Sequence, residues 1–131
     1  MNTRTPLGRA RGLGSTKDGV AHWWAQRLTS LALIPLSVWF AGSIVGLAGA
    51  DYATVLSWIG SPFPAIMLIL FVATALHHGQ QGLSVIIEDY VHLEALKITA
   101  LVLVKLGAAA VSVATAFSVL RIALAGAGAH G

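Results

Sequence analysis

The chain has 131 residues, of which 56% are hydrophobic and 10% are charged, and its mean hydropathy is +0.80. A typical soluble domain carries about 25% charged residues, so this composition excludes a water-soluble globular domain. The chain contains no cysteine, which excludes disulfides, thiolate-ligated iron–sulfur clusters and c-type haem attachment within it. The length allows one domain.

The first 27 residues form a basic segment ahead of the first apolar stretch. Its five positive charges are Arg4, Arg9, Arg11, Lys17 and Arg27. Residues 1–17 contain no acid, which is also a property of mitochondrial transit peptides. The interpretation that we prefer is a positively charged flank of a membrane helix, with His22, Trp23 and Trp24 as an interfacial anchor.

Three apolar stretches follow, at residues 28–50, 64–87 and 98–124. Each is long enough for the roughly 20 residues with which a helix crosses about 30 Å of hydrocarbon. Backbone polar groups in lipid must be paired within the protein, so each stretch is predicted to be a helix. We therefore predict an all-α membrane protein, with a three-helix anchor domain at residues 28–125 and a flexible tail at 126–131.

The distribution of Lys and Arg predicts the orientation of these spans. Five such residues precede the first span and Lys97 follows the second, whereas the loop around residues 51–62 has none and Arg121 lies near the C-terminus. Cytoplasmic loops carry the excess of positive charge. We expect a cytoplasmic N-terminus and second loop, a periplasmic C-terminus, and a multi-pass protein of the bacterial inner membrane.

The second span carries a histidine at membrane depth. At 100° per residue, one stripe of this helix contains His78, Gly82, Val85 and Asp89, whereas His77 points about 100° away. His78 lies roughly 13 Å from the inner end of the span, near the midplane. A buried imidazole needs a partner. Three interpretations remain open: a neutral histidine bonded across a helix interface, a proton relay, or a metal or haem ligand.

The end of the same helix places Asp89 and Tyr90 at the membrane boundary. Such residues are commonly solvated or part of the interfacial aromatic belt. The functional alternative is a phenol donor beside a carboxylate at a quinone headgroup. In the third span we expect Lys105 to extend its amine towards the interface, with contact to a lipid phosphate or a haem propionate as the alternative.

Two motifs resemble the D-type hydrophobic anchor subunits of succinate dehydrogenase, respiratory complex II. In that family a histidine stands four residues before a glycine and eleven before an Asp-Tyr pair, spacings that His78 fits and His77 does not. The second motif is "GV" at residues 19–20 followed by "RLTS" at 27–30. The resemblance covers about residues 19–105.

The resemblance implies a role for each matched residue. His78 is expected to be one axial ligand of a b-type haem, with the other ligand supplied by a C-type anchor subunit. Tyr90 is expected to donate a hydrogen bond to ubiquinone, with Asp89 supporting that site. Arg27 is expected near the haem propionates or the quinone pocket.

The resemblance also implies partners and a place in metabolism. FAD and the iron–sulfur clusters belong to a flavoprotein subunit and an iron–sulfur subunit, which oxidise succinate in the tricarboxylic acid cycle and pass electrons into the respiratory chain. This chain is expected to have no succinate chemistry of its own. The alternatives are the anchor of a quinol:fumarate reductase, a cofactor-free structural membrane subunit, and a transporter subunit with His78 and Asp89 on a proton path. A mitochondrial inner-membrane location is less expected.

Overall fold

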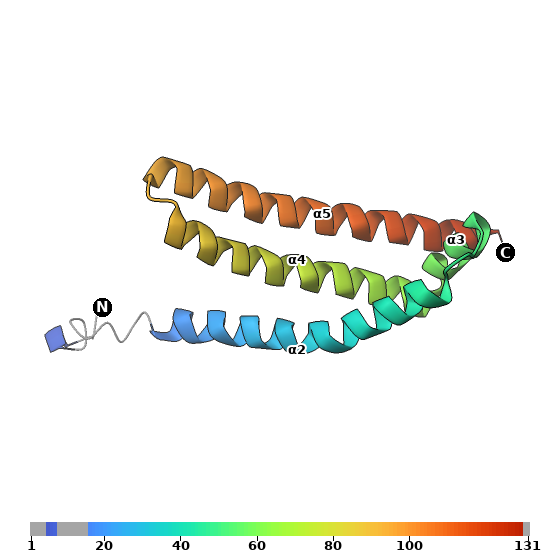
Figure 1. Cartoon of the computed structure of the whole chain (residues 1–131), viewed down its shortest axis with the longest axis horizontal. Coiled ribbons are helices and arrows are strands. Elements are labelled where there is room, and N and C mark those ends of the chain that lie inside the picture. The colour runs from blue at the N-terminus through green and yellow to red at the C-terminus, as the bar shows by residue number, and fades with distance from the viewer. Residues whose placement is uncertain (1–4, 8–15, 130–131) are drawn as a thin grey trace.

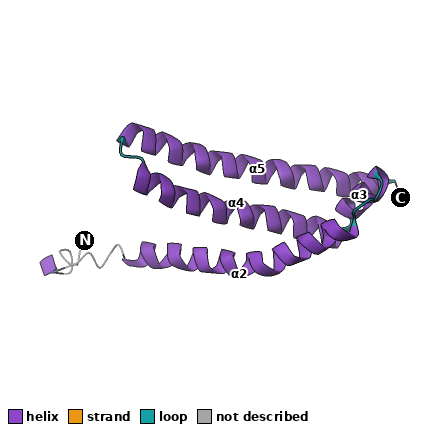
Figure 2. Cartoon of the chain, viewed as in Figure 1, coloured by secondary structure: helices purple, strands orange, loops and turns teal. Residues whose placement is uncertain are grey.

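The computed structural model describes residues 5–7 and 16–129, and the elements in this part of the chain are helices and the turns between them (Figure 2). The helices are α2 (Thr16–Gly46), α3 (Tyr52–Gly60), α4 (Pro62–Tyr90) and α5 (Glu94–Gly128). Within the described ranges, three helices are long and apolar enough to cross a membrane, namely Gly19–Gly46, Pro62–Tyr90 and Glu94–Gly128. The prediction of an all-α protein with three spans is confirmed.

The helix bounds differ from the predicted spans, and a glycine turn and a proline mark two of the boundaries. α2 begins at Thr16, well before residue 28, and ends at Gly46, before a turn in which Gly49 has φ of +81°. Only glycine adopts that backbone conformation without strain. α4 begins with Pro62, a residue that is tolerated in the first helical turn because the turn has no partner for its N–H. α5 continues to Gly128, so part of the predicted tail is helical, and residues 130–131 lie outside the described range.

The connection between the first two spans contains α3, which the sequence analysis treated as a loop. The Asp51 side chain accepts a hydrogen bond from the Thr54 backbone N–H at 3.1 Å and so caps the helix. An N-cap carboxylate pairs one of the N–H groups that the first turn leaves free. Hydrogen bonds from the Thr54 hydroxyl and from its backbone N–H lower the pKa of Asp51 from its ordinary value of 3.8.

The three long helices run up, down and up, with α4 between α2 and α5 (Figure 1). The start of α2 and the α4–α5 connection lie at one end of the molecule, and α3 and the C-terminal end of α5 lie at the other. α4 packs against both long neighbours, and α3 packs against α4 and α5, whereas no Cα atoms of α2 and α5 lie within 8 Å of each other in the described residues. The arrangement agrees with the predicted pairing of the N-terminus and second loop on one side; which side is cytoplasmic stays a prediction.

Aromatic side chains hold the α3 end together. Trp39 of α2 stacks on Trp58 of α3 with ring centroids 5.7 Å apart and meets Phe63 of α4 edge to face at 6.2 Å. Phe40 and Phe71 stack at 4.7 Å between α2 and α4. Each such pair adds about 0.5–1.5 kcal/mol beyond the area that it buries. We call these five residues the aromatic cluster.

Candidate functional site: the polar half of the bundle

A recess of about 400 Å³ lies between the three long helices in the half of the bundle next to the α4–α5 connection. Every lining residue but Leu101 is polar, and the set is His22 from α2, His77, Gln80, Gln81, Ser84 and Glu88 from α4, and Leu101 and Lys105 from α5. We call it the polar recess. Polar side chains at membrane depth are costly and usually functional. The half of the bundle next to the α4–α5 connection is therefore the candidate functional site.

Gln81 is the buried centre of the polar recess. It is 7% exposed, and its Oε1 has no hydrogen-bond partner within the described chain. Leaving a buried acceptor unpaired costs about 1–3 kcal/mol. Another molecule that supplies a donor, either water or a partner subunit, would remove that cost.

His78 lies beside the polar recess and faces α2. Its Nδ1 is 3.1 Å from Oγ1 of Thr29. The same Thr29 oxygen is 2.8 Å from the carbonyl oxygen of Ala25 and 3.1 Å from that of Gln26. His77, by contrast, is exposed and lines the recess. The two neighbouring histidines therefore occupy different surroundings, as their 100° separation predicts.

Two glycines leave open space along this part of α4. A Cβ added at Gly79 or Gly82 would meet nothing within 4 Å. Gly82 shares the helical stripe of His78, four residues further on. The chain itself fills neither position, so a planar group or another helix can approach the α4 backbone closely there.

Asp89 and Tyr90 form the last turn of α4, at the same end of the molecule as the start of α2. Both side chains are exposed, and Tyr90 retains 77% of its accessible surface. The Val91 N–H bonds to the carbonyl of Ile87 and ends the helix. The phenol and the carboxylate are therefore accessible to a partner or ligand at this end.

Arg27 lies on a different face of α2 from the histidine contact. Its guanidinium carbon is 5.3 Å from the centre of the Trp23 ring, a cation–π arrangement. Two residues along a helix correspond to 200°, so Arg27 and Thr29 point in nearly opposite directions. The structure brings His78 to Thr29 and leaves Arg27 with Trp23.

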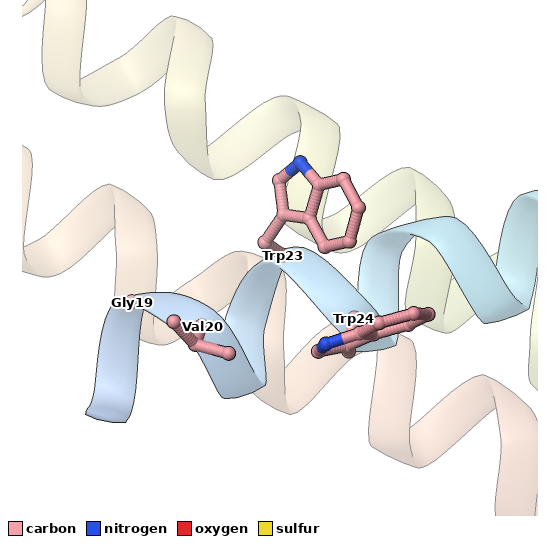
Figure 3. A pocket seen from close by; sticks show the side chains of 4 residues that line it. All are labelled: Gly19, Val20, Trp23 and Trp24. Atoms are coloured by element: carbon pink, nitrogen blue, oxygen red, sulfur yellow. The ribbon is translucent and has the colours of Figure 1, made fainter. Parts of the chain in front are cut away.

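The tryptophan pair lines a second recess, of about 540 Å³, together with Gly19 and Val20 (Figure 3). The rings of Trp23 and Trp24 are 5.1 Å apart and nearly perpendicular. Both rings are about half exposed. We call this open, apolar surface of Gly19, Val20, Trp23 and Trp24 the tryptophan shelf. Its place at the start of α2 agrees with the predicted interfacial anchor.

The residues that the structure describes contain no group of three or more His, Cys, Asp or Glu side chains that could hold a metal ion. A haem needs fewer protein ligands than such a metal site, because a single imidazole from one chain can bind its iron. His78 is a half-buried imidazole with open space at Gly82 on its stripe. These residues fit one axial side of a haem.

The fold and this site define a class, that of small three-span helical membrane subunits with a polar, histidine-containing half. A family model described as "Succinate dehydrogenase/Fumarate reductase transmembrane subunit" matches residues 1–116. The chain belongs to this family, and its resemblance to the succinate dehydrogenase anchors is confirmed.

Similar proteins are described as membrane anchor subunits of succinate dehydrogenase. The succinate dehydrogenase hydrophobic membrane anchor subunit of Rickettsia bellii is 32% identical over 103 residues, which cover 79% of this chain and 82% of the relative. The one from Paracoccus denitrificans is 34% identical over 90 residues, covering 69% and 70%. The membrane anchor subunit of Reclinomonas americana is 30% identical over 93 residues, covering 69% and 78%. No solved structure matches the chain.

The sequence analysis missed Thr29 and Gln81 as members of the site. Thr29 appeared only as part of the "RLTS" motif, and Gln81 was not singled out within the apolar stretch 64–87. A helical projection centred on Gln81 places His77, Ser84 and Glu88 within about 60° of it. That polar face was visible in the sequence, whereas the Thr29 contact depends on how α2 packs.

Proposed function

We propose that the chain is a D-type membrane anchor of a succinate:quinone oxidoreductase and that it helps to bind a b-type haem and ubiquinone. The observation that carries this proposal is His78, a half-buried imidazole at membrane depth whose stripe has open space at Gly82. Family membership provides the context, and the haem and quinone roles are the proposal.

On this proposal His78 would supply one imidazole nitrogen to the haem iron, and a second, C-type anchor subunit would supply another ligand. Gly79 and Gly82 leave room for the macrocycle against α4. A bound haem accepts and releases single electrons, so it can take part in their transfer to quinone. Arg27, whose guanidinium lies over the Trp23 ring, would pair with a haem propionate or a quinone oxygen.

For quinone, the exposed end of α4 offers the required donor. The Tyr90 hydroxyl would donate a hydrogen bond to a quinone carbonyl. The Asp89 carboxylate next to it would hold the phenol and exchange protons with the aqueous side. Both lie at the end that the positive-inside rule assigns to the cytoplasm.

The partners follow from the family. An anchor of this kind joins a flavoprotein subunit and an iron–sulfur subunit, which carry FAD, the clusters and succinate oxidation. The exposed end of α4 and the tryptophan shelf at the start of α2 lie on the side where those subunits would dock. The similar proteins are named as succinate dehydrogenase subunits, which favours succinate oxidation over fumarate reduction for this chain.

The test is a reduced-minus-oxidised visible spectrum of the purified complex with a matched pair of variants. We expect a b-type haem signal that is lost in His78→Ala and retained in His77→Ala. The pair is well matched because the residues are adjacent and only His78 contacts Thr29. Equal haem signals in both variants would remove His78 as the ligand.

A further inference from the structure

We infer that Thr29 is a positioning residue that selects the tautomer of His78, with the proton on Nδ1 and the free lone pair on Nε2. This inference rests on the proposed role of His78 as a haem ligand. It assigns to α2 a part in cofactor binding that differs from the role expected for Arg27. The Thr29 hydroxyl makes three short contacts, and together they point to this tautomer.

The first step concerns the proton of the Thr29 hydroxyl. Oγ1 is 2.8 Å from the Ala25 carbonyl oxygen and 3.1 Å from that of Gln26. A carbonyl only accepts hydrogen bonds, and a hydroxyl has one proton to give. Donation to the carbonyl of the preceding turn is the usual arrangement for threonine inside a helix. The hydroxyl proton is therefore directed to the backbone, and the oxygen lone pairs remain for His78.

The second step concerns the imidazole. Nδ1 of His78 is 3.1 Å from Thr29 Oγ1, within the ordinary range for a nitrogen donor. Because that oxygen can only accept in this direction, Nδ1 must carry the hydrogen. A neutral imidazole has one such hydrogen, so Nε2 is unprotonated. An unprotonated nitrogen is what coordination to iron requires.

The third step is that the contact also fixes the ring. Thr29 and His78 come from different helices and lie 49 positions apart in the sequence. The hydrogen bond therefore sets the ring relative to α2 as well as α4. A hydrogen bond to the non-coordinating nitrogen orients a metal-bound histidine and raises its basicity, and loss of such partners typically costs about 10- to 100-fold in metal affinity.

The adjacent Ser30 is a matched control. Its hydroxyl also donates to a backbone carbonyl, that of Gln26, at 2.8 Å, and it is half-buried on the same helix. The hydrogen bond of His78 is to Thr29 and not to Ser30. Replacing Ser30 removes a similar hydroxyl without changing the histidine contact.

The experiment uses the whole complex with Thr29→Val, Thr29→Ser and Ser30→Ala, and His78→Ala as reference. The readouts are the rate at which haem passes to excess apomyoglobin and the midpoint potential of the retained haem. We expect Thr29→Val to lose haem about 10-fold faster or more and to raise the potential, because a less basic imidazole stabilises ferric iron less. Thr29→Ser restores the acceptor and should match the wild type, as should Ser30→Ala.

The outcomes separate this inference from the proposed function. If His78→Ala loses haem but Thr29→Val matches Ser30→Ala in both readouts, the inference is wrong and the haem ligand stands. If His78→Ala keeps its haem, the proposed ligand itself is wrong. Should Thr29→Val fail to assemble, Thr29→Ala is measured in its place, and its agreement with Ser30→Ala would equally overturn the inference.

Discussion

The two ends of this bundle are held together in different ways. At the α3 end, the aromatic cluster and the close approach of Gly60 to Ile122 pack the helices directly; a Cβ on Gly60 would lie 3.4 Å from the Ile122 carbonyl oxygen. Towards the α4–α5 connection, the polar recess lies between the helices, and the Gln81 oxygen has no partner among the described residues. Helices in lipid associate through packing and hydrogen bonds. The first end is packed by apolar side chains, whereas the second holds a buried acceptor that the described chain does not pair.

The largest expected effect lies at the polar end. Replacing Tyr90 by Phe removes the phenol donor and should slow quinone reduction by about 100-fold or more, the scale of a positioned proton donor. Succinate oxidation with a soluble artificial acceptor should continue, because the flavoprotein and iron–sulfur subunits carry it. Steady-state assays with quinone and with the soluble acceptor measure the two rates separately. Equal loss of both activities would mean that Tyr90 supports assembly instead.

At the aromatic end we expect a change in stability and no change in chemistry. Trp58→Ala removes the stacking partner of Trp39 and should cost about 2 kcal/mol, less than the roughly 3–5 kcal/mol of a fully buried aromatic. Thermal unfolding of the complex in detergent measures the loss, and the haem spectrum serves as the control. A shifted haem spectrum with unchanged stability would contradict the assignment of stability to the α3 end and of haem binding to the polar end.

Gln81 tests whether assembly completes the polar recess. If a partner or water pairs its Oε1, Gln81→Leu should destabilise the complex by about 1–3 kcal/mol. Gln80→Leu is the control, since Gln80 is less buried and bonds to Ser84 of its own helix. Thermal unfolding of both variants measures the difference. No difference would indicate that the buried amide stays unpaired after assembly.

The smallest effect concerns the cap of α3. The folded pKa of Asp51 is below the ordinary 3.8, with hydrogen bonds from Thr54 as the cause. The cap therefore stabilises the helix above pH 3.8 and loses its contribution as the pH falls through the lower folded value. Protection of the first turn of α3 from hydrogen exchange, measured relative to the intrinsic exchange rate at the same pH, should fall at that acidic pH. Asp51→Asn retains an N-cap side chain that does not titrate, so its protection should not change over this range.

The sequence predicted the three spans because length, hydropathy and the exclusion of water leave few solutions. It did not predict α3, since nine residues at a membrane surface carry too little periodicity, and the deciding contacts come from Trp39 and Ile122 on other helices. It also began the first helix too late. Hydropathy marks where hydrocarbon begins, whereas α2 extends beyond that point to Thr16.

For the site, helical spacing separated His78 from His77, and the structure places them in different surroundings. The partner of His78 could not be predicted from spacing within one helix. Thr29 reaches it only through the packing of α2 on α4. The roles of Tyr90, Asp89 and Arg27 depend on molecules outside the chain and stay predictions.

The central position of α4 has a consequence for the life of the subunit in the cell. Because α4 lies between α2 and α5, the three spans form a single layer, and only Ala65, Val119 and Gln81 are buried among the described residues. In a copy without its partners, exposed polar side chains such as His77 and Glu88 would face lipid, which is unfavourable. We expect such orphan copies to be degraded by membrane proteases, so that the amount of this chain follows the supply of its partners.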